Sequence, residues 1–212
     1  MIPVVVLAAG KSTRMGRPKA TLRLDDADTF LTRIIRTFQA AQVDDVVVVL
    51  GHEAEAIVKS VEQSGLSLRF VVNEQFESGQ LSSVLAGLRA IDRPGVNAML
   101  MTLVDVPLVS AATVRAVLDR YRTTRAPVVR PVRGALHGHP VLIDRSLFDK
   151  LRAADPQRGA KPIIRAHVSA AGDVEVEDEG AFFDVDTPED YRRVVEPGTK
   201  PGDSGNNSGD PG

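Results

Sequence analysis

Hydrophobic and polar positions along the chain alternate between short aliphatic runs and longer segments with helical spacing. Residues 4–7 are apolar at consecutive positions, which is typical of a strand covered on both faces. Residues 29–41 place apolar side chains three or four positions apart, and residues 46–50 return to an unbroken aliphatic run. This order predicts a βαβ unit with parallel strands.

The same cycle repeats further along the chain. The pattern predicts helices at residues 54–63 and 82–90 and strands at residues 68–72 and 98–103. Strands that alternate with helices favour an α/β fold with a doubly wound, mostly parallel sheet.

After this region the rhythm changes, and we expect α+β insertions on the same sheet. Ser110 is a good N-cap for a helix that reaches Tyr121. The elements expected beyond it are strands at 126–132, 141–143, 174–177 and 182–185, short helices near Ser146 and Pro162, and a terminal helix that starts at Thr187 and Pro188.

The two ends of the chain call for separate interpretation. The N-terminal apolar run has no basic region before it, so we interpret it as a strand rather than an export signal. No apolar run approaches the roughly 20 residues that span a bilayer.

Residues 197–212 contain almost only small and polar side chains, and we expect a disordered tail there. The domain count is therefore one, over residues 1–196.

Composition limits the possible functions. The 28 acidic and 26 basic residues leave a net charge of -2, which argues against a surface built for nucleic acid or for an anionic membrane. The absence of Cys excludes disulfides, iron–sulfur clusters and a thiol nucleophile, and points to the cytoplasm. Any anion-binding site must therefore be local.

A local concentration of positive charge follows the first strand. The segment LAAGKSTRMGRPK, residues 7–19, carries Lys11, Arg14, Arg17 and Lys19, and no acidic residue occurs before Asp25. A cationic loop at the carboxyl end of a central strand is suited to a phosphate. The loop is neither a GxGxxG fingerprint nor a Walker A motif. The alternative is a solvated loop whose charges have no ligand.

The complete loop matches the pattern LAAGxSxRMGxxK and resembles the MobA-like nucleotidyltransferase superfamily, in particular the molybdenum cofactor cytidylyltransferases. The resemblance continues through NEQFESGQLSSVLAGL, VDVP, GHP and DVDTPEDY, and it covers residues 1 to about 195. Two positions depart from the family pattern, Glu74 and Val106, and they bear on the substrate more than on the reaction.

The resemblance implies a Rossmann-like nucleotidyltransferase fold, CTP as donor, and a molybdopterin-type or other phosphorylated acceptor whose product passes to a molybdoenzyme. CTP is implied because guanylyl-transferring relatives tend to carry LAGG where this chain has LAAG. The residues expected to bind the nucleotide are Leu7, Ala8, Ala9, Gly10, Ser12, Arg14, Lys19, Asn73, Gly79, Ser82 and Ser83.

A cation site is expected at two carboxylates. Asp105 ends an aliphatic strand at the same sheet edge as the basic loop, and Asp186 is the best second ligand. Two carboxylates plus substrate phosphates are a donor set that suits Mg²⁺. The alternatives are a turn role for Asp105 and a helix-start role for Asp186. Arg14, Lys19 and Asp105 are the catalytic candidates.

Three further positions are candidates for acceptor binding. His139 lies in the GHP segment, which the resemblance places towards the acceptor, and Arg158 and Lys161 flank a basic turn. A surface loop is the alternative for that turn. Ser82 and Ser83 are also candidates for capping the helix they begin. His137 and His139 lack partners at spacing suited to zinc.

The expected reaction is nucleotidyl transfer, with Arg14 and Lys19 on the triphosphate and Mg²⁺ on Asp105 and Asp186. Three alternatives stay open. These are a related transferase that acts on a sugar phosphate or another small phosphorylated molecule, a noncatalytic carrier of molybdenum cofactor, and a dinucleotide-dependent oxidoreductase, which lacks its fingerprint.

Overall fold

The computed structural model describes residues 1–62 and 64–196. The tail expected at residues 197–212 lies outside the described residues.

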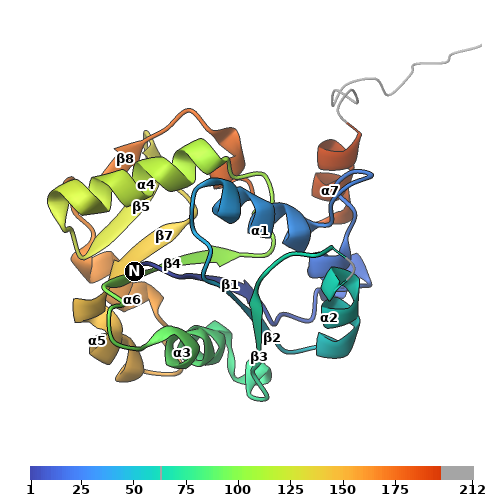
Figure 1. Ribbon diagram of the computed structural model, residues 1–212, viewed down its shortest axis with the longest axis horizontal. Coiled ribbons are helices and arrows are strands. Elements are labelled where there is room, and N and C mark those ends of the chain that lie inside the picture. The colour runs from blue at the N-terminus through green and yellow to red at the C-terminus, as the bar shows by residue number, and fades with distance from the viewer. Residues whose placement is uncertain (63, 197–212) are drawn as a thin grey trace, which may run out of the picture.

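A single mixed sheet organises these residues (Figure 1). Its strands are β1 (Val4–Ala8), β2 (Val46–Leu50), β3 (Arg69–Val72), β4 (Ala98–Leu103), β5 (Val128–Arg133), β6 (Leu136–His137), β7 (Val141–Asp144) and β8 (Asp173–Glu175). The spatial order is β3-β2-β1-β4-β7-β5-β6, with β8 paired to β5. Strands β1 to β4 are parallel, which confirms the predicted doubly wound sheet, whereas β7 runs antiparallel to β4 and β5.

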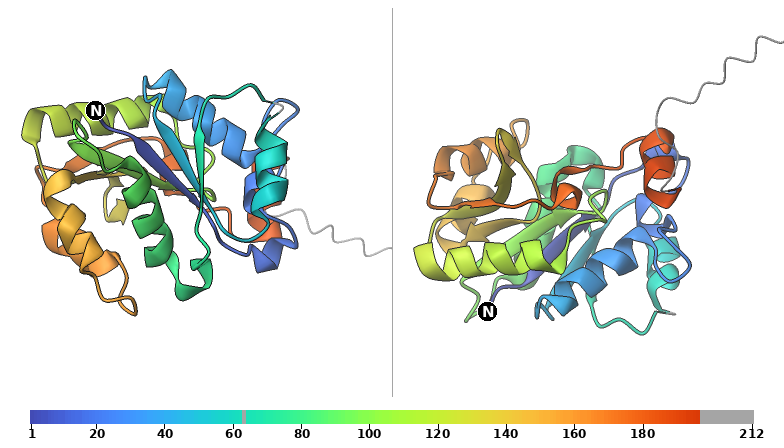
Figure 2. Two further views of the ribbon diagram at one scale, coloured as in Figure 1. Left: turned by 60° about the horizontal axis from the view of Figure 1, so that its bottom comes forward. Right: turned by 90° about the horizontal axis from the view of Figure 1, so that it is seen from above.

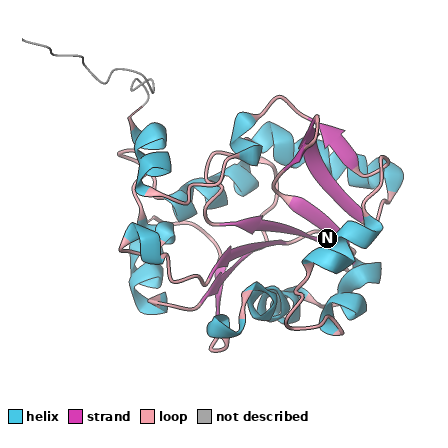
Figure 3. Cartoon of the chain, turned by 180° about the vertical axis from the view of Figure 1, so that it is seen from behind, coloured by secondary structure: helices cyan, strands magenta, loops and turns pink. Residues whose placement is uncertain are grey.

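Helices cover both faces of this sheet, as Figures 2 and 3 show from other directions. They are α1 (Phe30–Ala40), α2 (Ala54–Glu62), α3 (Gln80–Ile91), α4 (Ala111–Thr124), α5 (Phe148–Arg152), α6 (Lys161–His167) and α7 (Pro188–Val195). Helices α1, α2 and α4 contribute to one buried cluster, and α3 and α5 contribute to the other. Strands β1 and β2, which lie between the two clusters, are therefore buried on both faces.

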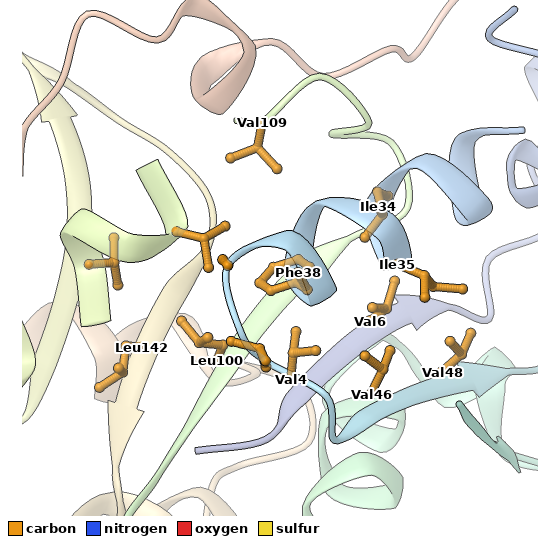
Figure 4. Packing of buried hydrophobic residues seen from close by; sticks show 14 of the residues in the cluster. Val4, Val6, Ile34, Ile35, Phe38, Val46, Val48, Leu100, Val109 and Leu142 are labelled. Atoms are coloured by element: carbon orange, nitrogen blue, oxygen red, sulfur yellow. The ribbon is translucent and has the colours of Figure 1, made fainter. Parts of the chain in front are cut away.

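This arrangement explains why the first strand is apolar at every position. Val4 and Val6 point towards α1, where they pack with Ile34 and Phe38 (Figure 4). Val5 belongs to the cluster on the opposite face, which α3 covers. A strand buried on both faces has no solvent side, so period-two alternation disappears.

Two helix starts are capped as the sequence predicts. The Ser110 side chain accepts a hydrogen bond from the Thr113 N–H, and the Thr187 side chain accepts one from the Asp190 N–H. Ser82 and Ser83 were expected as candidates to cap α3, and this prediction is wrong. That helix begins at Gln80 with Gly79 as N-cap, and no side chain caps it.

The strand predicted at residues 182–185 is also wrong. A short turn over Glu179–Phe182 is followed by extended backbone that pairs with no strand. The segment crosses the carboxyl ends of the strands, where the Ala181 carbonyl accepts from the His139 N–H and the Val185 N–H donates to the backbone carbonyl of Asp105. An extended bridge between loops needs the same residue types as a strand, so the pattern alone does not separate them.

Within the described residues, every helix is too short or too polar to cross a membrane.

Gly87 of α3 packs against Val5 of β1, and this contact gives a stability prediction. A Cβ on Gly87 would lie 2.3 Å from Val5 Cγ1. Ala normally stabilises a helix interior by about 1 kcal/mol relative to Gly. Here we expect Gly87→Ala to lower the free energy of unfolding by about 1–3 kcal/mol, the cost of an overpacked core. Urea denaturation measures this difference.

The matched control is the double variant Val5→Ala with Gly87→Ala, which removes the clashing methyl groups. Its loss of stability should be smaller than the sum of the two single losses. An increase in stability for Gly87→Ala alone would contradict the packing argument.

Candidate active site

The basic loop after β1 is folded back on itself by its own backbone. Ser12 adopts a left-handed conformation with φ of 49°, and its carbonyl accepts a hydrogen bond from the Met15 N–H. The Ser12 hydroxyl accepts a second bond, at 3.1 Å, from the backbone N–H of Lys19. Gly16 turns the chain again with φ of 68°. These contacts bring Lys19 to the carboxyl end of β1.

A neighbouring glycine lets three segments meet beside this loop. A Cβ on Gly51, which follows β2, would lie 2.7 Å from the Ala9 carbonyl oxygen and from Phe76. Since these are contacts that Cβ atoms do not make, only glycine fits there. Phe76 thereby packs close to the strand ends and lines the cavity above them.

Lys19 joins the basic loop to two acidic residues that are distant in sequence. Its ammonium lies 2.6 Å from Asp186 Oδ1 and 3.3 Å from Asp105 Oδ2. The Lys19 side chain is only 11% exposed, whereas that of Asp186 is 51% exposed. The predicted proximity of Asp105 to the basic loop is confirmed. The lysine expected on phosphate oxygens instead pairs with both carboxylates.

Each carboxylate is positioned by backbone contacts. Val104 donates to the Leu7 carbonyl, which ties the end of β4 to β1 and places Asp105 beside the loop. Asp186 directly precedes the N-cap of α7, and that helix is anchored by the Tyr191 hydroxyl, which donates to the Arg23 carbonyl. Helix α7 therefore brings Asp186 across to β1.

The carboxylates retain capacity for a cation. Asp105 Oδ1 is buried and has no hydrogen-bond partner among the described residues. A buried carboxylate oxygen without a partner is costly, so it is a natural ligand for a hard cation. The described residues contain no cluster of three or more His, Asp or Glu side chains arranged for a metal. The donor set therefore fits Mg²⁺ that draws its other ligands from substrate phosphates and water.

A third carboxyl group, that of Asp184, lies near Asp105 and Asp186. Burial, together with the nearby carboxylates of Asp105 and Asp186, raises the pKa of Asp184 above its usual value. Sequence reasoning missed Asp184, although the spacing of DVD in DVDTPED was a usable signal.

A cavity of 280 Å³ opens at the carboxyl ends of β1 and β4, and most of the residues predicted to bind the nucleotide line it. Its lining consists of Leu7, Ala9, Gly10, Ser12, Lys19, Phe76, Gly79, Gln80, Ser83, Leu103, Val104 and Asp105. Ala8 is buried in β1 and does not line it. Phe76, Gln80, Leu103 and Val104 were not predicted. A lone aromatic in the NEQFESGQ segment was the available signal for Phe76.

Arg14 lies in an adjoining hollow of 180 Å³, together with Asp186, Met15, Ser12 and Lys19. Lys19 and Ser12 line both spaces, so they form the wall between them.

Asn73 holds the second nucleotide motif together rather than facing the cavity. Its side-chain N–H groups donate to Ser82 Oγ at 2.8 Å and Ser83 Oγ at 3.0 Å, and its side-chain oxygen accepts from the Gln75 N–H. Ser83 lines the cavity, whereas Asn73 and Ser82 do not. Asn73 therefore fixes the turn that carries Gly79 and Ser83.

The predicted acceptor residues separate into two places. His139 and Lys161 line a cavity of 390 Å³ with Asp184, Gln80 and Leu103, so this cavity borders the first one. Burial lowers the pKa of His139, and its Nδ1 lies 3.5 Å from the Met101 carbonyl oxygen. The imidazole is therefore neutral at pH 7 and suited to hydrogen bonding.

Arg158 lies apart from this cavity, in a different hollow beside Lys150. The structure thus brings together only His139 and Lys161 of the three residues.

Comparison with known proteins identifies the family. A family model described as "MobA-like NTP transferase domain" matches residues 4–171. Curated relatives include the nicotine blue oxidoreductase of Paenarthrobacter nicotinovorans, 32% identical over 90% of this chain and 95% of the relative. The molybdenum cofactor guanylyltransferase of Rhizobium meliloti is 30% identical over 91% of this chain and 89% of the relative.

Solved structures agree with this fold. Rv0371c from Mycobacterium tuberculosis H37Rv has a TM-score of 0.75 and 30% identity, over 92% of this chain and 97% of that one. A complex of Rv0371C with manganese has a TM-score of 0.70 and 27% identity, over 92% of this chain and 98% of that one. Since the family model spans most of its length, the chain belongs to the family of MobA-like NTP transferase domains and is a nucleotidyltransferase of that family.

Proposed function

We propose that the chain is a CTP:molybdenum cofactor cytidylyltransferase, which forms molybdopterin cytosine dinucleotide and pyrophosphate with Mg²⁺ as cofactor. One observation carries the proposal. Lys19 and two carboxylates meet at the carboxyl ends of the central strands, beside one cavity for a nucleotide and another for an acceptor. A cytoplasmic location and delivery of the product to a molybdoenzyme belong to the same proposal.

The chemistry needs no covalent intermediate. An oxygen of the acceptor phosphate attacks the α-phosphorus of CTP, the bond from that phosphorus to the bridging oxygen breaks, and pyrophosphate leaves with the electron pair. The acceptor oxygen is already ionised at pH 7, so a general base is dispensable. Arg14 and Lys19 supply positive charge for the triphosphate, and the folded loop pre-positions them.

Asp105 and Asp186 would hold Mg²⁺, and the buried unpartnered oxygen of Asp105 supports this role. When bound, the ion supplies positive charge that offsets the charge on the reacting phosphates.

The two cavities support transfer between two bound molecules. They share Gln80 and Leu103 in their linings, so a nucleotide in one and an acceptor in the other meet at this boundary. Lys161 offers a mobile cation to an acceptor phosphate, and the neutral His139 offers a hydrogen bond.

The proposal of CTP rests on the LAAG sequence at residues 7–10, because guanylyl-transferring relatives tend to carry LAGG at these positions. One relative named above is a guanylyltransferase, so membership of the family does not decide between CTP and GTP. Alternative acceptors are a sugar phosphate or another small phosphorylated molecule. A noncatalytic carrier of molybdenum cofactor would use the acceptor cavity but would not need the cation site.

A second candidate function comes from the relative named nicotine blue oxidoreductase. Reduction of an organic substrate would require a redox cofactor to bind in the cavity at β1. The loop there lacks the GxGxxG fingerprint of dinucleotide binding, so transfer is the better-supported proposal.

Incubation with Mg²⁺ and each of CTP, GTP, ATP and UTP, together with molybdopterin, its metal-bound form or other phosphorylated acceptors, separates these functions. We expect pyrophosphate release with CTP and a pterin acceptor. Release with a different pair would replace the substrates but keep the reaction. Binding of cofactor without any pyrophosphate would favour the carrier, and reduction of a dye with NADH or NADPH would favour the oxidoreductase.

Asp105→Asn tests the cation site with little change in shape. The variant loses a negative ligand at the point where charge develops, and we expect kcat to fall by about 10²–10³, the usual cost of removing one such electrostatic contact. Asp119→Asn is the matched control, because within the described part of the chain the Asp119 carboxylate pairs only with Arg122, on the exposed face of α4. Unchanged turnover in Asp105→Asn at saturating Mg²⁺ would contradict the assignment.

Lys161→Met tests the acceptor cavity. Loss of one charged contact to a phosphate should raise the KM for the acceptor about 10-fold and leave the KM for the nucleotide unchanged. Lys150→Met removes the same charge from the separate hollow that contains Arg158 and serves as control. Equal effects of the two substitutions would show that only general electrostatic attraction is involved.

A further inference from the structure

We propose that Lys19 and a divalent cation compete for the carboxylates of Asp105 and Asp186, so that binding of the cation releases the Lys19 ammonium to a triphosphate. The proposal deepens the transfer function and rests on it for the identity of the triphosphate. It assigns Lys19 two successive partners, which explains why a residue expected on phosphate pairs with acids.

The geometry shows direct competition for the same groups. The ammonium touches Asp186 Oδ1 at 2.6 Å and Asp105 Oδ2 at 3.3 Å, so it lies between the two carboxylates. A hard cation bound by both carboxylates would occupy the same neighbourhood, and two positive charges at such a distance repel strongly in a partly buried site. The ammonium and the cation therefore exclude each other.

The remaining acceptor capacity favours the cation once it arrives. Lys19 leaves Asp105 Oδ1 without a hydrogen-bond partner among the described residues. An ammonium satisfies the pair incompletely, whereas a divalent ion takes several oxygen ligands and carries twice the charge. The exchange thus replaces a lysine contact that leaves one oxygen of Asp105 unpaired with a cation that can bind that oxygen as well.

Lys19 lines two hollows that lie beside the carboxylates. Its N–H stays bonded to the Ser12 hydroxyl, and its side chain forms the wall between the main cavity and the Arg14 hollow. The proposed exchange would rotate the Lys19 side chain and turn its ammonium from the carboxylates into one of these spaces. Both spaces are where phosphate oxygens would lie.

The exchange makes binding of cation and triphosphate mutually supportive. Without the cation, a triphosphate must compete with two carboxylates for the Lys19 ammonium. With the cation bound, the ammonium is free, and linkage requires that the triphosphate strengthen cation binding by the same factor. Couplings of this kind are typically about 5- to 150-fold.

The experiment measures binding of Mn²⁺ alone to the full chain, with no nucleotide present, by the electron paramagnetic resonance signal of free Mn²⁺. In Lys19→Met the competitor is absent and the side-chain length is kept. We expect this variant to bind Mn²⁺ at least about 5-fold more tightly than the wild type. Lys19→Arg keeps a competing cation and should stay near the wild-type affinity.

Lys11→Met is the matched control for long-range charge. Lys11 lies in the same loop and its removal changes the net charge equally, but its ammonium pairs with Glu77 instead of the two aspartates. We expect a smaller gain in Mn²⁺ affinity for Lys11→Met than for Lys19→Met. Circular dichroism and thermal melts establish that each variant is folded.

A second measurement follows Lys19 in the wild-type protein itself. In wild-type protein carrying ¹³C-labelled lysine, titration with Mg²⁺ should shift the Lys19 Cε resonance and leave that of Lys11 nearly unchanged. Substitution of Lys19 assigns its signal.

The results separate this inference from the proposed function. Tighter Mn²⁺ binding by Lys19→Met, combined with no pyrophosphate release by the wild type, would support the exchange and contradict the transfer. Pyrophosphate release by the wild type, combined with equal Mn²⁺ affinities in the wild type and Lys19→Met or with a static Lys19 resonance, would overturn the exchange and leave the transfer intact. Absence of Mn²⁺ binding in all variants would also overturn the exchange.

Discussion

The ammonium of Lys19 lies between two carboxylates that follow it in sequence by 86 and 167 residues. This ionic contact joins the loop after β1, the end of β4 and the start of α7 at one edge of the sheet. Charges that are partly buried must be paired, since an isolated charge out of water is costly. The contact therefore constrains where three remote segments of the chain can lie.

The backbone makes this meeting possible through a few special positions. Gly51 allows Ala9 and Phe76 to approach closely, and Gly87 lets α3 lie directly on β1. Ser12 bends the basic loop and holds the Lys19 N–H with its hydroxyl. The site thus depends on local geometry that is set before any ligand binds, which is what positioning catalysis requires.

The sequence predicts the fold well where burial is symmetric and poorly where chain segments bridge loops. Unbroken aliphatic runs identify β1 and β2, and an apolar run interrupted by Thr102 identifies β4, because helices cover both faces of these strands. The segment at 182–185 has the same residue types but pairs with loops, and its partners cannot be seen from its own pattern. Caps at Ser110 and Thr187 are predictable because they are local.

The candidate site, like the fold, is predictable from the sequence only in part. Lys19 and Asp105 are predictable as neighbours, because parallel strands end at one edge. Their direct pairing is not, since charge patterns do not give distances. Asn73 matches a nucleotide-binding motif, yet its side chain donates hydrogen bonds to Ser82 and Ser83. Gln80 and Phe76 were not among the residues expected to bind the nucleotide, and the tertiary arrangement places them at the cavity.

We infer that the loop after β1 and the two aspartates together hold a cation-bound triphosphate. The most direct measurement is a crystal structure with Mn²⁺ and a non-hydrolysable CTP analogue, with the cation located by anomalous scattering. The account predicts an anomalous peak within bonding distance of Asp105 and Asp186, the triphosphate against residues 9–12, and the Lys19 ammonium on phosphate oxygens. A cation or nucleotide bound elsewhere, with Lys19 still on both carboxylates, would contradict it.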